Sequence, residues 1–474
     1  MPLVKTWQLI AGSAVAGLAL SAAVVASAGP WDSGQRKAER DRAASWSRTG
    51  GTDHGSGSGP GGLPQAAPSA PGVLQGVGPA RPRQAASPSG LPAALRPLLA
   101  DPALGTVRTA SVVDTATGQV LYESGAGDAM TPASTVKIAT AAAALAALGP
   151  EHRIRTTVAP GAAAGQIVLV GGGDPSLTAK KKTPVGGSLA ALAYDTAVAL
   201  KAAGTGTVTL GYDDSLYTGP ARHPIGDNPN IALVTSLAAD EGRPDDSTSG
   251  PVERVEDPAK EAARAFAALL TDKGIKVTGA PVKAKPVAGA QPLAVTLSTP
   301  LSGLVERMLT NSDNDIAEAL ARQTALASGQ PASFEGAEKA VAARLASLGV
   351  DVSGTRFADG SGLNRADKVS AGLLTGILAK AAGPDHPELR PVLTGLPVAG
   401  FTGTLRARNS GSSPAAGLLR AKTGTLTGVN SLSGTVVDRS GRLLAFAFLT
   451  ANTPGQEGAE KALDKLAAAV AATP

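Results

Sequence analysis

The sequence MTPASTVKIATA, residues 130–141, places a serine three residues before a lysine, in front of a run of good helix formers. Thr131 is expected to be the N-cap of this helix and Pro132 its first residue. Ser134 then lies in the first turn, and Lys137 lies one turn later on the same face. A serine hydroxyl needs a neighbouring base, and a lysine whose pKa is lowered by burial or nearby positive charge can be that base. The helix N-terminus also offers unpaired N–H groups where negative charge develops during acyl transfer.

Two further short motifs follow this pair along the chain. Ser312-x-Asn314 lies between two predicted helices, and Lys422-Thr423-Gly424 begins a predicted strand region. Each motif alone is a weak signal, since a solvated side chain, a helix cap or a charge at a strand edge would give the same residues. Their combination in this order favours one catalytic site built from three separate parts of the chain.

Composition limits the classes of function. The chain has 474 residues, enough for two structural domains plus tails, and only 3% aromatic residues, so the core must consist of Ala, Val and Leu. The net charge of +5 is spread over scattered basic residues, which does not favour nucleic-acid binding. The absence of cysteine excludes disulfides, thiolate catalysis and cysteine-ligated metals. A histidine-based zinc site is not expected, because no His-x-x-x-His pair occurs, whereas a Ser-His-Asp triad stays open because such triads assemble in space.

The first 28 residues are expected to be a signal peptide or a membrane anchor. They are mainly apolar from Trp7 to Ala28 and end in Ala26-Ser27-Ala28, the small-x-small pattern of a signal-peptidase site. The apolar run also reaches the roughly 20 residues that span a bilayer. More basic residues follow this run than precede it, and basic flanks favour the cytoplasmic side of a membrane. This distribution conflicts with export of the chain on an uncleaved anchor. We expect export, with cleavage or retention of residues 6–28 left open.

The remaining chain divides by composition. Residues 29–90 are rich in Gly, Pro, Ser and Ala, which indicates a disordered linker. Residues 91–156 and 296–474 are expected to form one domain, and residues 157–295 a β-rich domain inserted into it. Predicted helices and strands follow from periodicity and turn residues. The helices are Leu91–Ala100, the segment continuing through Ala139–Leu148, Leu189–Ala203, Asp257–Lys273, Leu301–Leu309, Asp315–Ala327, Glu335–Leu348, Ser370–Ala382 and Gln456–Ala472; the strands are Thr109–Val113, Gln119–Tyr122, Arg155–Val158, Gln166–Val170, Thr207–Leu210, a region from Lys422, Ser431–Val437 and Arg442–Thr450.

Four longer stretches extend the pattern of the three motifs: GGGDPSL at 171–177, GYDDSL at 211–216, DGSGL at 359–363 and LPVAG at 396–400. Together with the motifs, they resemble the D-alanyl-D-alanine carboxypeptidase/endopeptidase family of class C penicillin-binding proteins, which are penicillin-recognising serine enzymes. The resemblance covers about residues 91–474. It implies an α/β (α+β) fold, in which a β-lactamase/transpeptidase-like domain with an antiparallel sheet flanked by helices carries a β-rich domain inserted between the first and second motifs.

The resemblance implies acyl transfer through a serine ester. Ser134 would attack the carbonyl of a D-Ala-D-Ala peptide, Lys137 would take its proton, and Ser312, hydrogen-bonded between lysine side chains, would pass a proton to the leaving D-alanine. The family's oxyanion hole corresponds to the backbone N–H groups of Ser134 and Thr425. Water would then release the acyl-enzyme.

The remaining implied site residues bind substrate. Asn314 would hold the peptide amide and help to orient the base. Lys422, in the Lys422-Thr423-Gly424 motif, would add positive field, and Thr423 and Thr425 would bind the substrate's terminal carboxylate. No cofactor and no metal are implied. The implied partners are peptidoglycan stem peptides and, as inhibitors, β-lactams; no nucleic acid is implied, and a membrane only through an uncleaved N-terminal segment. The implied location is the extracytoplasmic cell envelope of a bacterium.

Two other functions are compatible with parts of this pattern. A serine β-lactamase shares the three motifs, but class A members use a Glu-x-x-Leu-Asn stretch for deacylation, and the chain has none. A non-catalytic cell-wall binding protein is disfavoured because all three motifs are intact. Carboxypeptidase and endopeptidase action differ only in whether the bond cut ends a stem or a cross-link, and the sequence leaves this choice open.

Overall fold

The computed structural model describes residues 90–180 and 186–473. The predictions for the N-terminal segment and for the linker up to residue 89 lie outside the described residues. Within the described ranges, no helix combines the length and the apolar character needed to cross a membrane.

The larger sheet has five strands in the order β2-β1-β11-β10-β9, and every neighbouring pair is antiparallel. The expected antiparallel sheet is therefore present. The first and last thirds of the chain meet in its centre, where Val107 of β1 pairs with Ala451 of β11. The strands are β1 Val107–Asp114, β2 Val120–Ser124, β9 Leu419–Leu426, β10 Val429–Val437 and β11 Leu443–Ala451.

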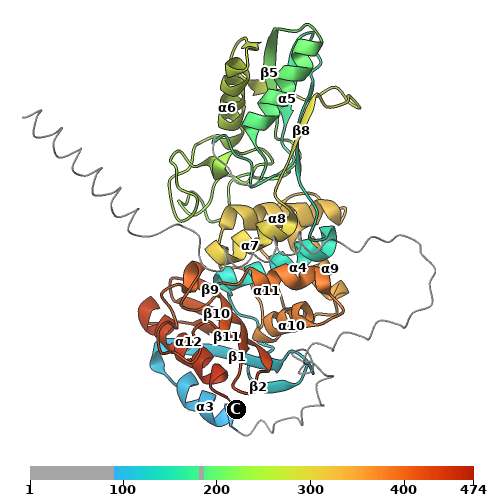
Figure 1. The fold of residues 1–474 in the computed structure, drawn as a ribbon. Coiled ribbons are helices and arrows are strands. Elements are labelled where there is room, and N and C mark those ends of the chain that lie inside the picture. The colour runs from blue at the N-terminus through green and yellow to red at the C-terminus, as the bar shows by residue number, and fades with distance from the viewer. Residues whose placement is uncertain (1–89, 181–185, 474) are drawn as a thin grey trace, which may run out of the picture. The chain divides into compact units, whose positions relative to one another are not determined.

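Helices cover both faces of this sheet (Figure 1). Successive side chains of a strand point to opposite faces, and β11 shows this clearly. Phe446 and Phe448 pack into one apolar cluster with α3 (Leu91–Leu99) and α12 (Gln456–Ala471), whereas Ala447 packs into the cluster on the other face. That second cluster includes α4 and the helices around it. Their bounds are α4 Lys137–Leu148, α7 Leu301–Asn311, α8 Asn314–Ala327, α9 Phe334–Ser347, α10 Ala371–Ala382 and α11 Arg390–Thr394.

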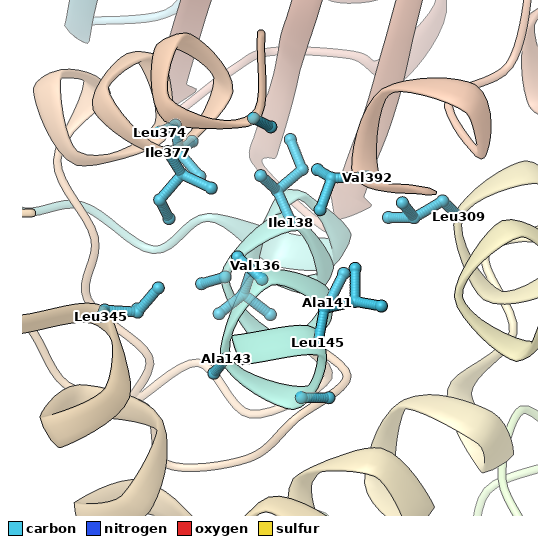
Figure 2. Packing of buried hydrophobic residues seen from close by; sticks show 14 of the residues in the cluster. Val136, Ile138, Ala141, Ala143, Leu145, Leu309, Leu345, Leu374, Ile377 and Val392 are labelled. Carbon is cyan, nitrogen blue, oxygen red and sulfur yellow. The ribbon is translucent and has the colours of Figure 1, made fainter. Parts of the chain in front are cut away.

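The helix that carries Lys137, α4, is the buried centre of this domain. Its residues from Lys137 to Leu145 are all buried. A helix that is apolar on every side is stable only when it is enclosed, and α4 is mostly alanine, which lets its neighbours approach closely. Figure 2 shows it surrounded by Leu309, Leu345 and Ile377 from three other helices. Lys137 is thus held by a rigid element.

The start of the serine–lysine helix differs from the sequence prediction. Ala133–Val136 form a 3₁₀ turn, and the α-helix begins at Lys137. Thr131 is not the N-cap, because its hydroxyl donates instead to the carbonyl of Arg365, at 3.0 Å. A tertiary contact therefore takes the side chain that local sequence assigns to a cap.

A second, mixed sheet lies between α4 and α7 along the chain. Its order is β6-β5-β4-β3-β8, with β7 also paired to β5. Strands β3 and β8 pair antiparallel with each other and so bring the entry and exit of this segment together. The segment also has two long helices in its core, so it has more helix than a β-rich domain implies. The elements are β3 Arg155–Pro160, β4 Gln166–Val170, α5 Leu189–Ala202, β5 Thr207–Asp213, α6 Pro258–Asp272, β6 Lys276–Val277, β7 Val282–Lys283 and β8 Ala294–Leu297. We call residues 155–297 the inserted region.

Candidate active site

The first motif brings its serine and lysine into direct contact. Lys137 Nζ lies 2.9 Å from Ser134 Oγ, within hydrogen-bond distance. Ala133, just before the serine, has φ 50°, a conformation that non-glycine residues rarely adopt. Such strain persists only where the surrounding structure imposes it, and it is common at functional sites. The local fold thus presents Ser134 to the base on a fixed turn.

Lys137 is completely buried and makes two further contacts. Its Nζ donates to Asn314 Oδ1 at 2.7 Å and to the carbonyl of Ser361 at 2.5 Å. Burial lowers the pKa of Lys137 from 10.5 to about 8, against the opposing charges of nearby carboxylates, of which Asp359 is the strongest. A substantial fraction of this amine is therefore neutral at neutral pH, as a general base requires.

The second motif lies at the junction of α7 and α8. Ser312 ends α7 with φ 60°, and Asn314 begins α8. The hydroxyl of Ser312 accepts a hydrogen bond from Lys422 Nζ at 2.9 Å, whereas Lys137 is bonded to Asn314. The expectation that Ser312 bridges two lysines is thus met on the Lys422 side. The amide of Asn314 bridges differently, since its Nδ2 donates to the carbonyl of Asn230 in the inserted region, at 2.9 Å.

The third motif lies on the edge strand β9. Lys422 is fully buried, and burial, followed by the charge of Lys137, lowers its pKa well below the usual value. The hydroxyl of Thr423 lies 3.0 Å from that of Thr404. The hydroxyl of Thr425 donates to Glu460 of α12 at 3.4 Å. The two threonines predicted to bind a carboxylate therefore have partners within the protein.

Two glycines allow the backbone around Ser134 to close. A Cβ at Gly424 would lie 2.6 Å from the Pro132 carbonyl and 3.1 Å from the Ser134 nitrogen. A Cβ at Gly362, where φ is +84°, would lie 2.1 Å from the Ala133 carbonyl. The distances to the two carbonyl oxygens are too short for a side chain. The glycine of the third motif thus has a steric function beside the nucleophile.

The motifs open onto one cleft of about 480 Å³. Ser134, Ser312, Asn314 and Thr425 line it, so the structure brings residues of all three predicted motif regions together. The inserted region forms another part of the wall. Its lining residues include Asn228, Asn230 and Arg243.

Sequence reasoning missed a buried ionic network beneath this cleft. His223, a lone histidine of the inserted region, lies beside Glu318 and Asp359, and the ligand atoms of the three lie within 4.8 Å of one another. The sequence places Asp359 in the DGSGL stretch at 359–363 but gives no role for its carboxylate. No local pattern marks His223, because its partners are far away in the sequence.

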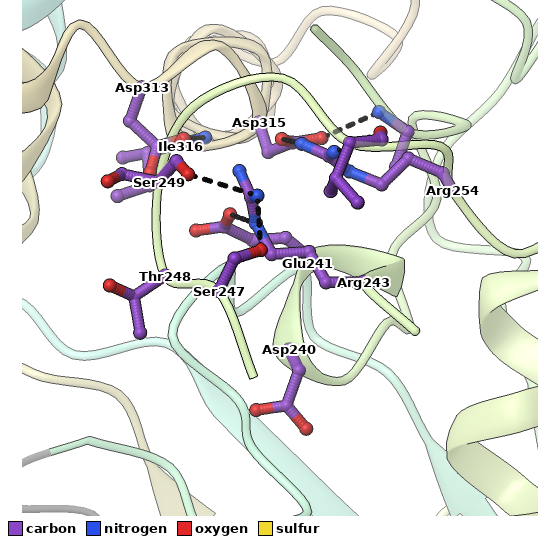
Figure 3. Close-up of polar contacts among 12 residues, drawn as sticks. Asp240, Glu241, Arg243, Ser247, Thr248, Ser249, Arg254, Asp313, Asp315 and Ile316 are labelled. Atoms are coloured by element: carbon purple, nitrogen blue, oxygen red, sulfur yellow. Dashed lines mark hydrogen bonds and ion pairs between the residues drawn. The ribbon is translucent and has the colours of Figure 1, made fainter. Parts of the chain in front are cut away.

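A second group of buried carboxylates flanks Asn314. The carboxylate atoms of Glu241, Asp313 and Asp315 also lie within 4.8 Å of one another, a spacing that could hold a cation. Burial, followed by the charge of Asp313, raises the pKa of Glu241 to about 8. Arginines already neutralise this group. Figure 3 shows Arg254 reaching Asp315, at 2.8 Å, and Arg243 reaching Glu241, at 2.9 Å.

The architecture and the motif geometry together are typical of penicillin-recognising serine enzymes. The model of the D-Ala-D-Ala carboxypeptidase 3 (S13) family matches residues 91–243 and 241–471. The carboxypeptidase DacB of Mycolicibacterium smegmatis is 40% identical over 389 residues, which cover 80% of this chain and 83% of the relative. A D-alanyl-D-alanine carboxypeptidase of Actinomadura sp. strain R39 is 32% identical over 73% of this chain and 78% of its own. The chain belongs to the S13 D-Ala-D-Ala carboxypeptidase family.

The comparisons confirm the predicted family and the predicted enzyme class, a serine-type D-Ala-D-Ala carboxypeptidase. The fold agrees with that of penicillin-binding protein 4 from Haemophilus influenzae, with a TM-score of 0.61 at 22% identity, covering 76% of this chain and 95% of that one. The same Haemophilus protein has also been solved in complex with a β-lactam, with a TM-score of 0.58 to this chain. The family acts on the cell wall, which agrees with an extracytoplasmic location.

Proposed function

We propose that this carboxypeptidase cleaves the terminal D-alanine from peptidoglycan stem peptides through an ester on Ser134, with Lys137 as the base. The observation that carries the proposal is the pair itself, because Nζ of a fully buried lysine lies 2.9 Å from the serine hydroxyl oxygen. Neutral Lys137 takes the hydroxyl proton as Ser134 Oγ attacks the peptide carbonyl.

The first step produces a charged lysine and an oxyanion. The lysine that forms is stabilised by Asn314 Oδ1 and by the Ser361 carbonyl, both already in place as acceptors. The backbone N–H groups of Ser134 and Thr425 are proposed to bind the oxyanion. Removal of one such donor typically costs roughly 100- to 1,000-fold in rate.

Proton delivery to the leaving D-alanine is proposed to pass through Ser312. Its hydroxyl is bonded to Lys422 at 2.9 Å, so a proton on this lysine can be passed through the hydroxyl to the departing nitrogen. Lys422 has a lowered pKa in the free protein because of burial and then of Lys137. The carboxylate of an incoming substrate would favour the charged form again.

Substrate binding is assigned to the cleft walls. Asn314 holds the peptide amide, and Thr423 and Thr425 bind the terminal carboxylate after exchanging their present partners, Thr404 and Glu460. Gly424 is assigned to the substrate-binding motif as the residue that admits β9 beside the nucleophile. We also propose that residues 157–295 act as a separate accessory domain on the transpeptidase-like parts 91–156 and 296–474.

Acylation by β-lactams follows from the same chemistry. A β-lactam carbonyl would be attacked by Ser134, but the leaving nitrogen stays tethered, so hydrolysis of the adduct is slow. We propose an extracytoplasmic enzyme, secreted or anchored by residues 6–28. Peptidoglycan stem peptides are its substrates and β-lactams its inhibitors.

The test is the intact mass of the protein after incubation with benzylpenicillin, followed by peptide mapping. A stable adduct on the peptide that contains Ser134, absent in Ser134→Ala and present in the control Ser347→Ala at the exposed end of α9, supports the proposal. Labelling that persists in Ser134→Ala contradicts the assignment of the nucleophile. Rapid release of hydrolysed drug with little adduct indicates a β-lactamase instead.

A further inference from the structure

A histidine of the inserted region is buried against residues of the catalytic domain. His223 follows β5 in the chain and is only 3% exposed. Its Nε2 lies 3.0 Å from Asp359 Oδ2 and 3.7 Å from Glu318 Oε1. Its ring meets the edge of Phe334 at 5.3 Å between centroids. The imidazole is therefore fixed on its polar and on its apolar side.

Asp359, which contacts this histidine, organises a tight turn. Its carboxylate accepts backbone N–H bonds from Ser361 at 3.0 Å, from Gly362 at 2.6 Å and from Asn364 at 2.7 Å. Glu318 Oε1 accepts from the N–H groups of Gly360 and Ser361, both at 3.0 Å. Two buried carboxylates thus hold the backbone of one turn, and His223 lies beside both.

This turn touches the catalytic pair. The carbonyl of Ser361 accepts from Lys137 Nζ at 2.5 Å, and the carbonyl of Gly360 accepts from Thr140 on the next turn of α4, at 2.7 Å. A continuous series of contacts therefore runs from His223 through Asp359 and the turn to Lys137. Each member of the series is buried.

The contacts of the His223 ring place its proton on Nε2. The backbone N–H of Ile225 donates to Nδ1 at 3.3 Å, so Nε2, which faces Asp359, is the nitrogen that carries the proton. Facing the ring are the carboxylates of Asp359 and Glu318 and, on the same helix as Glu318, the guanidinium of Arg322, which stacks on Phe334 at 3.9 Å. Asp367 takes part as a neutral acid, since burial and then Asp359 raise its pKa to about 10.

We propose that His223, supplied by the inserted region, is a positioning residue for Lys137. It holds the Asp359 carboxylate, and through it the Ser361 carbonyl, in the place where the lysine amine is kept beside Ser134. The inserted region thus supports the catalytic site through His223, in addition to lining the cleft. This inference rests on the proposed function, because positioning matters only if Lys137 is the base.

The kinetic test is His223→Gln in the full chain, with saturation kinetics of acylation by benzylpenicillin from pH 6 to 10. A misplacement of about 1 Å costs roughly 100-fold, so we expect a loss of about 10- to 100-fold in the acylation rate constant at pH 7, with non-covalent affinity nearly unchanged. Without His223 as its partner, the Asp359 carboxylate can shift, and Asp359 is the strongest of the charges that raise the pKa of Lys137. The rising part of the pH profile should therefore move from its wild-type position.

The matched control is His386→Gln, since His386 pairs with Glu388 at 3.0 Å and belongs to none of the site contacts described. It should acylate at the wild-type rate. A folded His223→Gln protein with an unchanged rate and an unchanged rising part of the pH profile would overturn the inference. If Ser134→Ala forms no adduct in the same experiment, an unchanged His223→Gln protein overturns only the role of His223 and leaves the proposed function standing.

A second measurement needs no variant. The chain has only four histidines, so nitrogen-15 spectra of histidine-labelled protein can follow each ring. The His223 signal is assigned by its absence from His223→Gln, or by elimination with single variants at the other three histidines. We expect this ring to carry a proton on Nε2 at pH 7, since Nε2 faces Asp359 and Nδ1 accepts from the Ile225 N–H. A ring without a proton on Nε2 refutes the inference even if His223→Gln fails to fold.

Discussion

The rate of acylation should follow the neutral fraction of Lys137. Its pKa falls from 10.5 to about 8 because burial disfavours the charged form of the amine. This desolvation effect is larger than the stabilisation of the charged form by the surrounding carboxylates. At pH 7, a pKa of 8 leaves about 10% of the amine neutral, whereas a pKa of 10.5 would leave about 0.03%. Burial of this one group therefore increases the population of active base roughly 300-fold.

The assay is the pseudo-first-order rate of benzylpenicillin adduct formation at constant ionic strength between pH 5.5 and 9.5. Because the neutral amine is the active form, the rate should rise about tenfold per pH unit below pH 8 and level off above it. The rate of D-alanine release from a short D-Ala-D-Ala peptide should rise with pH in the same way. A rate that is flat from pH 6 to 8, or a break near 6.5 as for an ordinary histidine, would refute Lys137 as the base.

Three other substitutions test separate parts of the structure. Lys137→Ala should lower the acylation rate constant by about 100- to 10,000-fold, the usual range for a general base, while equilibrium binding of the intact β-lactam measured by calorimetry is largely kept. Gly424→Ala should destabilise the fold by about 1–3 kcal/mol and reduce the acylation rate, because the new Cβ would clash with neighbouring atoms. Gly455→Ala is the control, since a Cβ there meets no atom within 4 Å. Equal thermal stability of the two variants would contradict the packing argument. Arg254→Ala should lower the free energy of unfolding by about 3–5 kcal/mol in denaturant titrations, since it leaves the largely buried Asp315 carboxylate without the arginine that pairs with it. A change below about 1 kcal/mol would show that this ion pair does not stabilise the fold.

The contact between Ser134 and Lys137 could be predicted because it is local. A lysine three residues after a serine reaches it from the next helical turn whatever surrounds the helix, and the observed contact of 2.9 Å agrees. Most helices and strands of the catalytic domain were predictable from the sequence, since β11 is a nearly continuous apolar run and α12 has one apolar face; the short helix α11 was not predicted. Turn residues then marked most of the boundaries.

The missed features depend on contacts between distant segments. Threonine is a residue type that often caps helices, but the hydroxyl of Thr131 donates to the carbonyl of Arg365, more than two hundred residues later. The environment of His223 is made by Glu318 and Asp359, whose carboxylates reach it only after the inserted region has folded onto the catalytic domain. The hydrogen bond from Asn314 to the Asn230 carbonyl is another such contact. No periodicity of the sequence contains this information.

The strand order has a consequence for how the molecule can be made. Strand β1, near the beginning of the folded part, is completed only when β11, near its end, pairs with it along eight residues. A chain that emerges N-terminus first can thus fold the inserted region early, whereas the catalytic domain must wait for almost the whole polypeptide. Contacts this far apart in sequence slow folding and leave strand edges exposed in the meantime. Loss of the chain after residue 442 would therefore remove the centre of the sheet, and the enzyme's assembly should depend on protection of β1 until synthesis and transport are finished.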